Sequence, residues 1–294
     1  VWVTAEKAGI RTAAMYWPGS NVAVGGVRAE AWPNATTGGV RPSAWQGYYM
    51  ALPQANRVDA IIDWLRRPAA VRPRFLTLYF DTVDTAGHNY GPDAPETTAA
   101  VADVDRLIGQ LTQELAALGQ PVNLIVTADH GMIGVSRDRL VELDTLIGKD
   151  SYRLLDHGAF ATLIPNPGQE ARIAAVLTKP QPHMQCWTRD AVPVRFHYGH
   201  NPRVAPIVCI AAHGWQIKRD ASQLFRDIGG DHGFDPNDPQ MFGLFVANGP
   251  AFRSGKRLAP FDNVDVAPLV RQLIGLPADP TLDGNAKRFG PVLR

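Results

Sequence analysis

Carboxylate and imidazole side chains occur together at two places in the chain, each just after an apolar run. These places are Asp84-Thr-Ala-Gly-His88 and Asp129-His130-Gly131, and a further imidazole stands in Asp231-His232-Gly233. Aspartate oxygens and histidine nitrogens together suit Zn²⁺ better than Mg²⁺ or Ca²⁺. Two carboxylates and three imidazoles exceed the ligands of one four-coordinate zinc with an open position, so they indicate two metal ions. Paired ions chiefly hold the attacking and leaving oxygens of a displacement at phosphorus. The candidate ligands are Asp84, His88, Asp129, His130 and His232.

Each of these patterns also has a simpler explanation. Asp84 and His88 are four residues apart, so a helical turn would place them on one face, but a capping aspartate and a surface histidine would have the same spacing. Asp129 could likewise cap a helix beside a hydrogen-bonded histidine. The tripeptide Asp-His-Gly occurs three times and is therefore not specific by itself. We interpret its copy around His157 as structural, because it precedes an apolar run instead of following one.

The elements that must position the candidate ligands form a βαβ pattern. Apolar runs predict buried strands at 75–80 and 122–127, and an amphipathic pattern predicts a long helix over 95–118 between them. Both ligand pairs follow a strand, Asp84 and His88 in the loop after the first. Sites in parallel α/β sheets form outside the carboxyl ends of the strands. We therefore expect an α/β fold whose mainly parallel central sheet is flanked by helices.

Further elements extend this α/β pattern. They are predicted strands at 10–17 and 243–247 and predicted helices at 55–67 and 264–274. Residues 18–53 are rich in Gly, Pro, Trp and Asn and show no periodicity. A long irregular stretch of this kind is expected at the surface, where it lines a site.

Residues 138–228 differ in character from the rest of the chain. Short strands joined by proline-rich connections are predicted there at 158–164, 184–188 and 207–212. We interpret this stretch as a smaller α+β lobe inserted into the α/β core. The predicted organisation is an α/β core over 1–137, the inserted lobe over 138–228 and a return to the core over 229–294.

Composition and charge exclude several classes of function. Of the 294 residues, 45% are hydrophobic and 19% are charged, which is typical of a soluble globular protein. A net charge of +1 without a basic run predicts no nucleic-acid surface, and no apolar run reaches the roughly 18 residues of a membrane helix. The two cysteines, Cys186 and Cys209, lack the C-x-x-C spacing of a zinc ribbon. They could form a disulfide or remain two buried thiols, and the sequence decides neither.

Several motifs follow one another along nearly the whole chain. They are Trp2-Val-Thr-Ala-Glu, Tyr16-Trp-Pro-Gly-Ser20, Phe80 through Asp84-Thr-Ala-Gly-His88-Asn-Tyr-Gly-Pro92, Thr127-Ala-Asp-His-Gly-Met132, Arg195-Phe-His-Tyr198 and Gly230-Asp-His-Gly233. In these motifs and their order the chain resembles the nucleotide pyrophosphatase/phosphodiesterase family of the alkaline phosphatase superfamily. The resemblance implies an alkaline phosphatase-like fold.

The resemblance also implies two zinc ions per site. One would be held by Asp84, His88 and His232, and the other by Asp129 and His130 with two upstream residues. The sequence opens without Met, in what reads as the middle of an element. We therefore expect the N-terminal part of the domain, with the remaining metal-binding aspartate and the nucleophilic threonine, to precede residue 1.

Neither a catalytic threonine nor a base-binding residue is obvious from the motifs. Thr82 and Thr85 flank a candidate metal ligand, and Thr4 opens a short helix, so none of them stands where the family places its nucleophile. The resemblance suggests an aromatic platform for the nucleotide base. Tyr79 and Tyr48 are the candidates, although core packing would explain Tyr79 equally well.

The implied function is hydrolysis of nucleotide phosphodiester or pyrophosphate bonds through a phospho-threonine intermediate, releasing a nucleoside 5′-monophosphate. The implied partner is a small nucleotide such as a nucleoside triphosphate or a dinucleotide, and the implied location is periplasmic or secreted. The alternatives are a phosphomonoesterase or phosphonate hydrolase of the same superfamily, or a noncatalytic binding protein with the same fold. The sequence places no Arg or Lys beside the ligand segments, and Arg137 and Arg139 are the nearest. This favours a diester, because a monoester needs cations for its extra charge.

Overall fold

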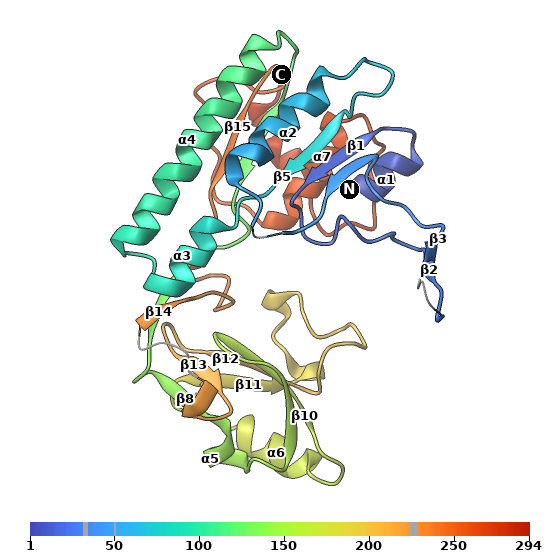
Figure 1. Ribbon diagram of the computed structural model, residues 1–294. Coiled ribbons are helices and arrows are strands. Elements are labelled where there is room, and N and C mark those ends of the chain that lie inside the picture. The colour runs from blue at the N-terminus through green and yellow to red at the C-terminus, as the bar shows by residue number, and fades with distance from the viewer. Residues whose placement is uncertain (32–34, 50, 224–227) are drawn as a thin grey trace. The chain divides into compact units, whose positions relative to one another are not determined.

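The computed structural model (Figure 1) describes residues 1–31, 35–49, 51–223 and 228–294. Residues 32–34 and 50 of the predicted irregular stretch, and residues 224–227 of the predicted lobe, lie outside these ranges. The chain divides into two compact units. The first comprises Val1–Asp81, Asp103–Val126 and Phe245–Arg294, and the second comprises Thr82–Ala102 and Thr127–Leu244.

The first unit contains the parallel sheet that the sequence predicts. Its central strand β1 (Thr12–Met15) pairs in parallel with β4 (Ala44–Gln46) on one side and with β5 (Phe75–Leu78) on the other. All four residues of β1 are buried, as expected of a central parallel strand. The strands predicted at 10–17 and 75–80 are therefore confirmed with shorter bounds. The sequence missed β4, because two of its three residues are exposed and it lacks an apolar run.

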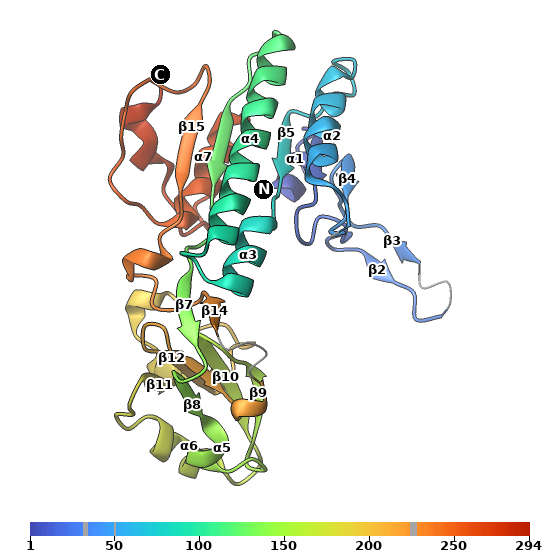
Figure 2. The same cartoon turned by 60° about the vertical axis from the view of Figure 1, so that its left-hand side comes forward.

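Helices cover both faces of this sheet. They are α1 (Trp2–Lys7), α2 (Gln54–Arg66), α4 (Pro95–Ala117, which joins this unit from Asp103) and α7 (Val266–Leu273). Both views show α2 beside β5 (Figures 1 and 2). Leu76 and Leu78 of β5 pack with α2 and α4, whereas Phe75 packs with α1 and with the segment that follows α7. Since successive strand residues point to opposite sides, the two groups of helices lie on opposite faces.

Two further strand pairs complete the first unit, although Thr127 at the end of one strand is assigned to the second unit. β6 (Leu124–Thr127) pairs with β15 (Phe245–Asn248), and β2 (Val27–Arg28) pairs with β3 (Thr36–Thr37). Phe245 packs with Leu269 of α7 in a separate apolar cluster. The predicted strands at 122–127 and 243–247 and the predicted helices are thus confirmed, with ends that differ by a few residues.

The second unit is built around an antiparallel sheet. Its four strands run in the order β11-β12-β10-β9. Their bounds are β9 (Tyr152–Asp156), β10 (Phe160–Pro165), β11 (Met184–Thr188) and β12 (Ile207–Ala211). The last three confirm the short strands predicted within the inserted lobe. Their inward residues, such as Leu163 and Cys209, form the core of this unit.

Smaller elements surround that sheet. They are α3 (Thr82–Tyr90), β7 (Ile133–Ser136), β8 (Leu140–Glu142), α5 (Leu143–Ile147), α6 (Glu170–Leu177), β13 (Gln216–Lys218) and β14 (Ile228–Asp231). β13 pairs in parallel with β8, and β14 pairs antiparallel with β7. The second unit also contains residues outside the predicted lobe, and the predicted limits of that lobe at 138 and 228 stay a prediction. No helix in the described parts of the chain is both long and apolar enough to cross a membrane.

Cys186 and Cys209 form a disulfide that links β11 to β12. The two residues stand directly opposite each other in the antiparallel register, and both are buried. The sequence left open a disulfide or two buried thiols, and the pairing of the two strands brings the cysteines together as a disulfide.

Replacing Cys186 and Cys209 together by alanine is expected to lower the free energy of unfolding by about 3 kcal/mol, because the open chain gains loop entropy when unfolded. Urea denaturation without reductant measures this difference. Wild-type protein unfolded with reductant is the control and should match the double variant. Equal stability of the oxidised wild type and the double variant would contradict the prediction.

Candidate metal centre

Helix α3 presents Asp84 and His88 on one face. Asp84 lies in its first turn, where its negative charge complements the helix dipole, and His88 lies in its last. Nε2 of His88 is 3.4 Å from Oδ1 of Asp84. The prediction that these residues lie in a loop is wrong. Gly87 lies inside the helix, where a Cβ would come within 2.9 Å of the Met132 side chain, so close packing explains the glycine at this position.

Strand β14 lies close against α3 and carries the chain to His232. A Cβ at Gly229 would lie 2.5 Å from the carbonyl oxygen of His88, so only glycine allows this approach. Nδ1 of His88 is 2.9 Å from the carbonyl oxygen of Gly230. A carbonyl oxygen only accepts, so Nδ1 carries the proton and Nε2 keeps its lone pair. The contact thus leaves Nε2 as the nitrogen through which His88 could bind a metal ion.

A sharp turn after β6 positions Asp129 and His130. A Cβ at Gly131 would collide with the carbonyl oxygen of Gln240, which explains the glycine at this position. Nδ1 of His130 donates to the carbonyl oxygen of Gly131 at 2.9 Å, so Nε2 is again the free nitrogen. That Nε2 lies 3.5 Å from Oδ1 of Asp129.

The three segments meet in one cluster. Donor atoms of Asp84, His130 and His232 lie within 4.8 Å of one another. Nε2 of His232 is 3.6 Å from Oδ1 of Asp84, and the rings of His130 and His232 stack at 3.6 Å. Oδ1 of Asp84 is shielded from solvent and accepts no hydrogen bond from any residue that the structure describes. A buried carboxylate oxygen without a donor, surrounded by imidazole nitrogens, fits a divalent cation.

The electrostatics of the cluster keep His232 neutral. Burial lowers the pKa of His232 below its ordinary value, and the neighbouring His130 and His88 lower it further. The negative charges of Asp84 and Asp231 oppose this shift. A neutral imidazole is the form that binds a metal ion.

The structure brings the five predicted ligands close together without dividing them between two ions. The cluster of Asp84, His130 and His232 joins residues that the family resemblance assigns to different ions. His88 contacts this cluster through Asp84, and Asp129 contacts it through His130. Their division into two sites stays a prediction.

The Asp-His-Gly copy at 156–158 lies outside the cluster. His157 stands in the turn between β9 and β10, and its Nδ1 lies 3.4 Å from Nζ of Lys218. Burial lowers the pKa of Lys218, against the opposing charge of Asp231. No Arg or Lys beside the ligand segments could be recognised from the sequence. It missed Lys218 because this residue is far from them along the chain and its strand shows no motif.

Tyr48 and Tyr79 belong to the first unit and are joined there by Tyr16. The rings of Tyr16 and Tyr48 stack at 4.3 Å, and each lies 6.4 Å from the ring of Tyr79. Tyr16 is fully buried, whereas Tyr48 is 48% exposed. Burial raises the pKa of Tyr16 to about 12, with a further contribution from Asp81. The sequence did not single out Tyr16, although this residue opens the motif that ends at Ser20.

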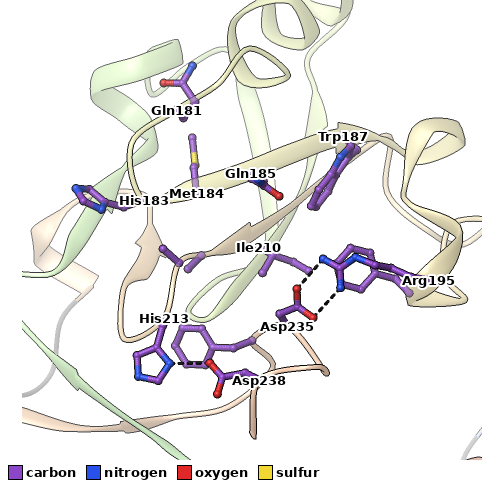
Figure 3. Close-up of a pocket in the computed structure, with 14 residues that line it drawn as sticks. Gln181, His183, Met184, Gln185, Trp187, Arg195, Ile210, His213, Asp235 and Asp238 are labelled. Carbon is purple, nitrogen blue, oxygen red and sulfur yellow. Dashed lines mark hydrogen bonds and ion pairs between the residues drawn. The ribbon is translucent and has the colours of Figure 1, made fainter. Parts of the chain in front are cut away.

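Arg195 of the motif Arg195-Phe-His-Tyr198 lies at a pocket of about 360 Å³ (Figure 3). Its guanidinium donates two hydrogen bonds, of 2.8 and 2.6 Å, to the carboxylate of Asp235. Nδ1 of His213 lies 2.6 Å from Oδ2 of Asp238 on another side of the pocket. The two pairs tie Arg195 and His213 to the segment that follows His232.

Known proteins share this fold and these motifs. The family model described as type I phosphodiesterase / nucleotide pyrophosphatase matches residues 1–235. Ectonucleotide pyrophosphatase/phosphodiesterase family member 5 of Homo sapiens is 32% identical over 282 residues, which are 95% of this chain and 56% of that protein. The bis(5′-adenosyl)-triphosphatase of Xenopus laevis is 34% identical over 283 residues, 95% of this chain and 59% of that protein. The chain thus spans more than half the length of these relatives.

Solved structures agree with the sequence comparison. Human family member 5 superposes with a TM-score of 0.89 and 31% identity, covering 100% of this chain and 74% of that one. An inactive Thr→Ala variant of murine family member 5, in complex with AMP, superposes with a TM-score of 0.88 and 32% identity over the same shares. These matches confirm the predicted alkaline phosphatase-like α/β fold. The chain therefore belongs to the type I phosphodiesterase / nucleotide pyrophosphatase family of the alkaline phosphatase superfamily.

Proposed function

We propose that the protein hydrolyses phosphodiester or pyrophosphate bonds of small nucleotides and releases a nucleoside 5′-monophosphate. The observation that carries this proposal is the buried Oδ1 of Asp84, which has no hydrogen-bond donor and faces imidazole nitrogens. The relatives named above are nucleotide pyrophosphatases or phosphodiesterases, and one of them binds AMP, a nucleoside 5′-monophosphate.

The metal-binding residues in this proposal are Asp84, His88, Asp129, His130 and His232, which would hold two zinc ions together with upstream residues. When bound, zinc supplies positive charge that stabilises the oxygens around the reacting phosphorus. The protein's own contribution is orientation. His88 and His130 donate from Nδ1 to backbone carbonyls, and both therefore present Nε2 without rearrangement.

The nucleophile in this proposal is a threonine upstream of residue 1. Its hydroxyl oxygen would lose its proton and bond to phosphorus, while the bond to the leaving oxygen breaks and that oxygen keeps the electron pair. Water would then cleave the phospho-threonine ester, which still carries the nucleoside, and release the nucleoside 5′-monophosphate and free threonine. The inactive Thr→Ala variant of the murine relative supports a threonine in this role. Tyr48 and Tyr79 would bind the nucleotide base. The exposed ring of Tyr48, stacked on the buried Tyr16, offers a rigid surface for such stacking.

The protein is proposed to act outside the cytoplasm, in the periplasm or after secretion. A disulfide between Cys186 and Cys209 supports this, because disulfides persist in oxidising compartments. The names of the related ectonucleotide enzymes point the same way.

The full-length protein is expected to cleave p-nitrophenyl thymidine 5′-monophosphate with a kcat/KM about 10- to 100-fold above that for p-nitrophenyl phosphate. The physical reason is that the monoester carries an extra negative charge. A charged group that finds no hydrogen-bond partner in the site loses about this factor in kcat/KM. Arg139, which follows the Asp129 segment, is already hydrogen-bonded to Ser136 and Gly134. Steady-state kinetics on zinc-loaded protein measure the ratio.

Protein treated with a chelator is the control and should lose both activities. A clear preference for p-nitrophenyl phosphate would favour the monoesterase alternative. No turnover of either ester by the zinc-loaded full-length protein would favour a noncatalytic binding protein.

A further inference from the structure

Lys218 is a buried cation on which the negative charge of Asp231 acts, but among the described residues it forms no ion pair. The residue is 7% exposed, and among the described residues its one polar contact is Nδ1 of His157 at 3.4 Å. An ammonium has three donors and no acceptor, so Nδ1 of His157 accepts and the ring is neutral. No carboxylate in the described parts of the chain lies within ion-pair distance of Lys218. Burying a charged ammonium without an ion-pair partner costs free energy, and a bound anion would offset that cost.

The backbone holds Lys218 and His157 together. Gly158 and Ile217, their neighbours in the chain, exchange two backbone hydrogen bonds of 2.8 and 2.7 Å. His157 is exposed, whereas Lys218 is buried behind it. The pair therefore combines a buried ammonium with an imidazole that reaches solvent.

Asp231 connects this pair to the metal centre. One of its oxygens, Oδ2, accepts from the backbone N–H of Ala159 at 3.0 Å and from Nε2 of Gln216 at 3.2 Å. Its other oxygen accepts from the backbone N–H of His232 at 2.9 Å. Gly158 passes so close that a Cβ there would lie 2.6 Å from Oδ2. Asp231 thus accepts hydrogen bonds from His232 itself and from Ala159 and Gln216, which stand two residues from His157 and Lys218, respectively.

The carboxylate of Asp231 does not satisfy Lys218. It already accepts three hydrogen bonds, and it forms no ion pair with the ammonium. The hydrogen bonds of Asp231 link the strand that carries Lys218 to the backbone of His232.

We propose that Lys218, oriented by His157, binds a phosphate group of the leaving group and selects substrates whose leaving group is a phosphate or polyphosphate. This inference rests on the proposed nucleotide hydrolysis. When the bond between phosphorus and the bridging oxygen breaks, that oxygen keeps the electron pair, so the leaving phosphate gains one negative charge. A fixed ammonium stabilises that charge, whereas a nitrophenolate leaving group has no phosphate to offer it.

The test compares ATP, whose leaving group is pyrophosphate, with p-nitrophenyl thymidine 5′-monophosphate, using zinc-loaded full-length protein. In Lys218→Met, the ratio of kcat/KM for ATP to that for the nitrophenyl ester is expected to fall about tenfold or more, the value of one charge-assisted hydrogen bond. Lys218→Arg keeps the charge and should keep the ratio within about threefold. The exposed Lys179→Met in the same unit is the matched control and should leave the ratio unchanged.

A second measurement separates this proposal from the proposed function. Calorimetric titration of the zinc-loaded protein with inorganic pyrophosphate should give about tenfold weaker binding for Lys218→Met than for wild type, even if neither ester is hydrolysed. A wild type that hydrolyses neither ester would overturn the proposed function alone. An unchanged ratio and unchanged pyrophosphate binding in a folded Lys218→Met would overturn the role of Lys218. So would equal losses on both substrates, because these indicate a merely structural lysine.

Discussion

Replacing His232 by alanine is expected to remove most of the bound metal and to lower nitrophenyl diester hydrolysis by about 10³-fold. The imidazole is one of three donors that lie within 4.8 Å of one another, and its loss removes a nitrogen donor beside the buried Asp84 oxygen. Metal charge at the phosphoryl group is worth several kcal/mol, and each 1.36 kcal/mol is a tenfold change in rate. Elemental analysis after gel filtration measures the metal, and steady-state kinetics measure the rate.

The chain supplies a matched control for this substitution. His157 stands in the same tripeptide, Asp-His-Gly, but lies in the turn before β10 and contacts Lys218. His157→Ala should therefore retain the metal content of the wild type. Loss of metal in His157→Ala together with its retention in His232→Ala would reverse the assignment of the third ligand segment.

Replacing Arg57 by methionine is expected to lower the free energy of unfolding by about 3–5 kcal/mol, because it leaves the buried Asp81 carboxylate unpaired. Arg57 Nη1 lies 2.8 Å from Asp81 Oδ1, with side chains only 2% and 8% exposed. The guanidinium also donates to the carbonyl oxygens of Leu52 and Tyr79 and lies 3.5 Å over the ring of Tyr16. Urea denaturation followed by circular dichroism measures the loss.

Arg66 on the same helix is the control for Arg57. Its ion pair with Asp63 spans 3.4 Å, but both side chains are more than half exposed, so Arg66→Met should change stability little. Adding Asp81→Asn to Arg57→Met should recover part of the loss, because no buried charge then lacks a partner. Similar stabilities of Arg57→Met and Arg66→Met would show that the buried pair does not stabilise the first unit.

The local chemistry of the ligand segments could be predicted from the sequence. Asp84 and His88, like Asp129 and His130, follow apolar runs that form β5 and β6, and this pattern depends only on neighbouring residues. Helices α2 and α4 were predictable for the same reason, since apolar residues recur at helical spacing. The family could be recognised because its motifs are contiguous and keep their order.

Contacts between distant residues could be decided only by the tertiary structure. The family resemblance already grouped His232 with Asp84, but no residue near either of them indicates their contact, which depends on the close approach of β14 to α3 at Gly229. The same holds for Lys218, which meets His157 through strand pairing, and for the disulfide, which needs β11 opposite β12. Residue type and spacing determine which side chains can bind metal or phosphate. Packing across long sequence separations decides which of them share a site, because it depends on the shapes of all the elements at once.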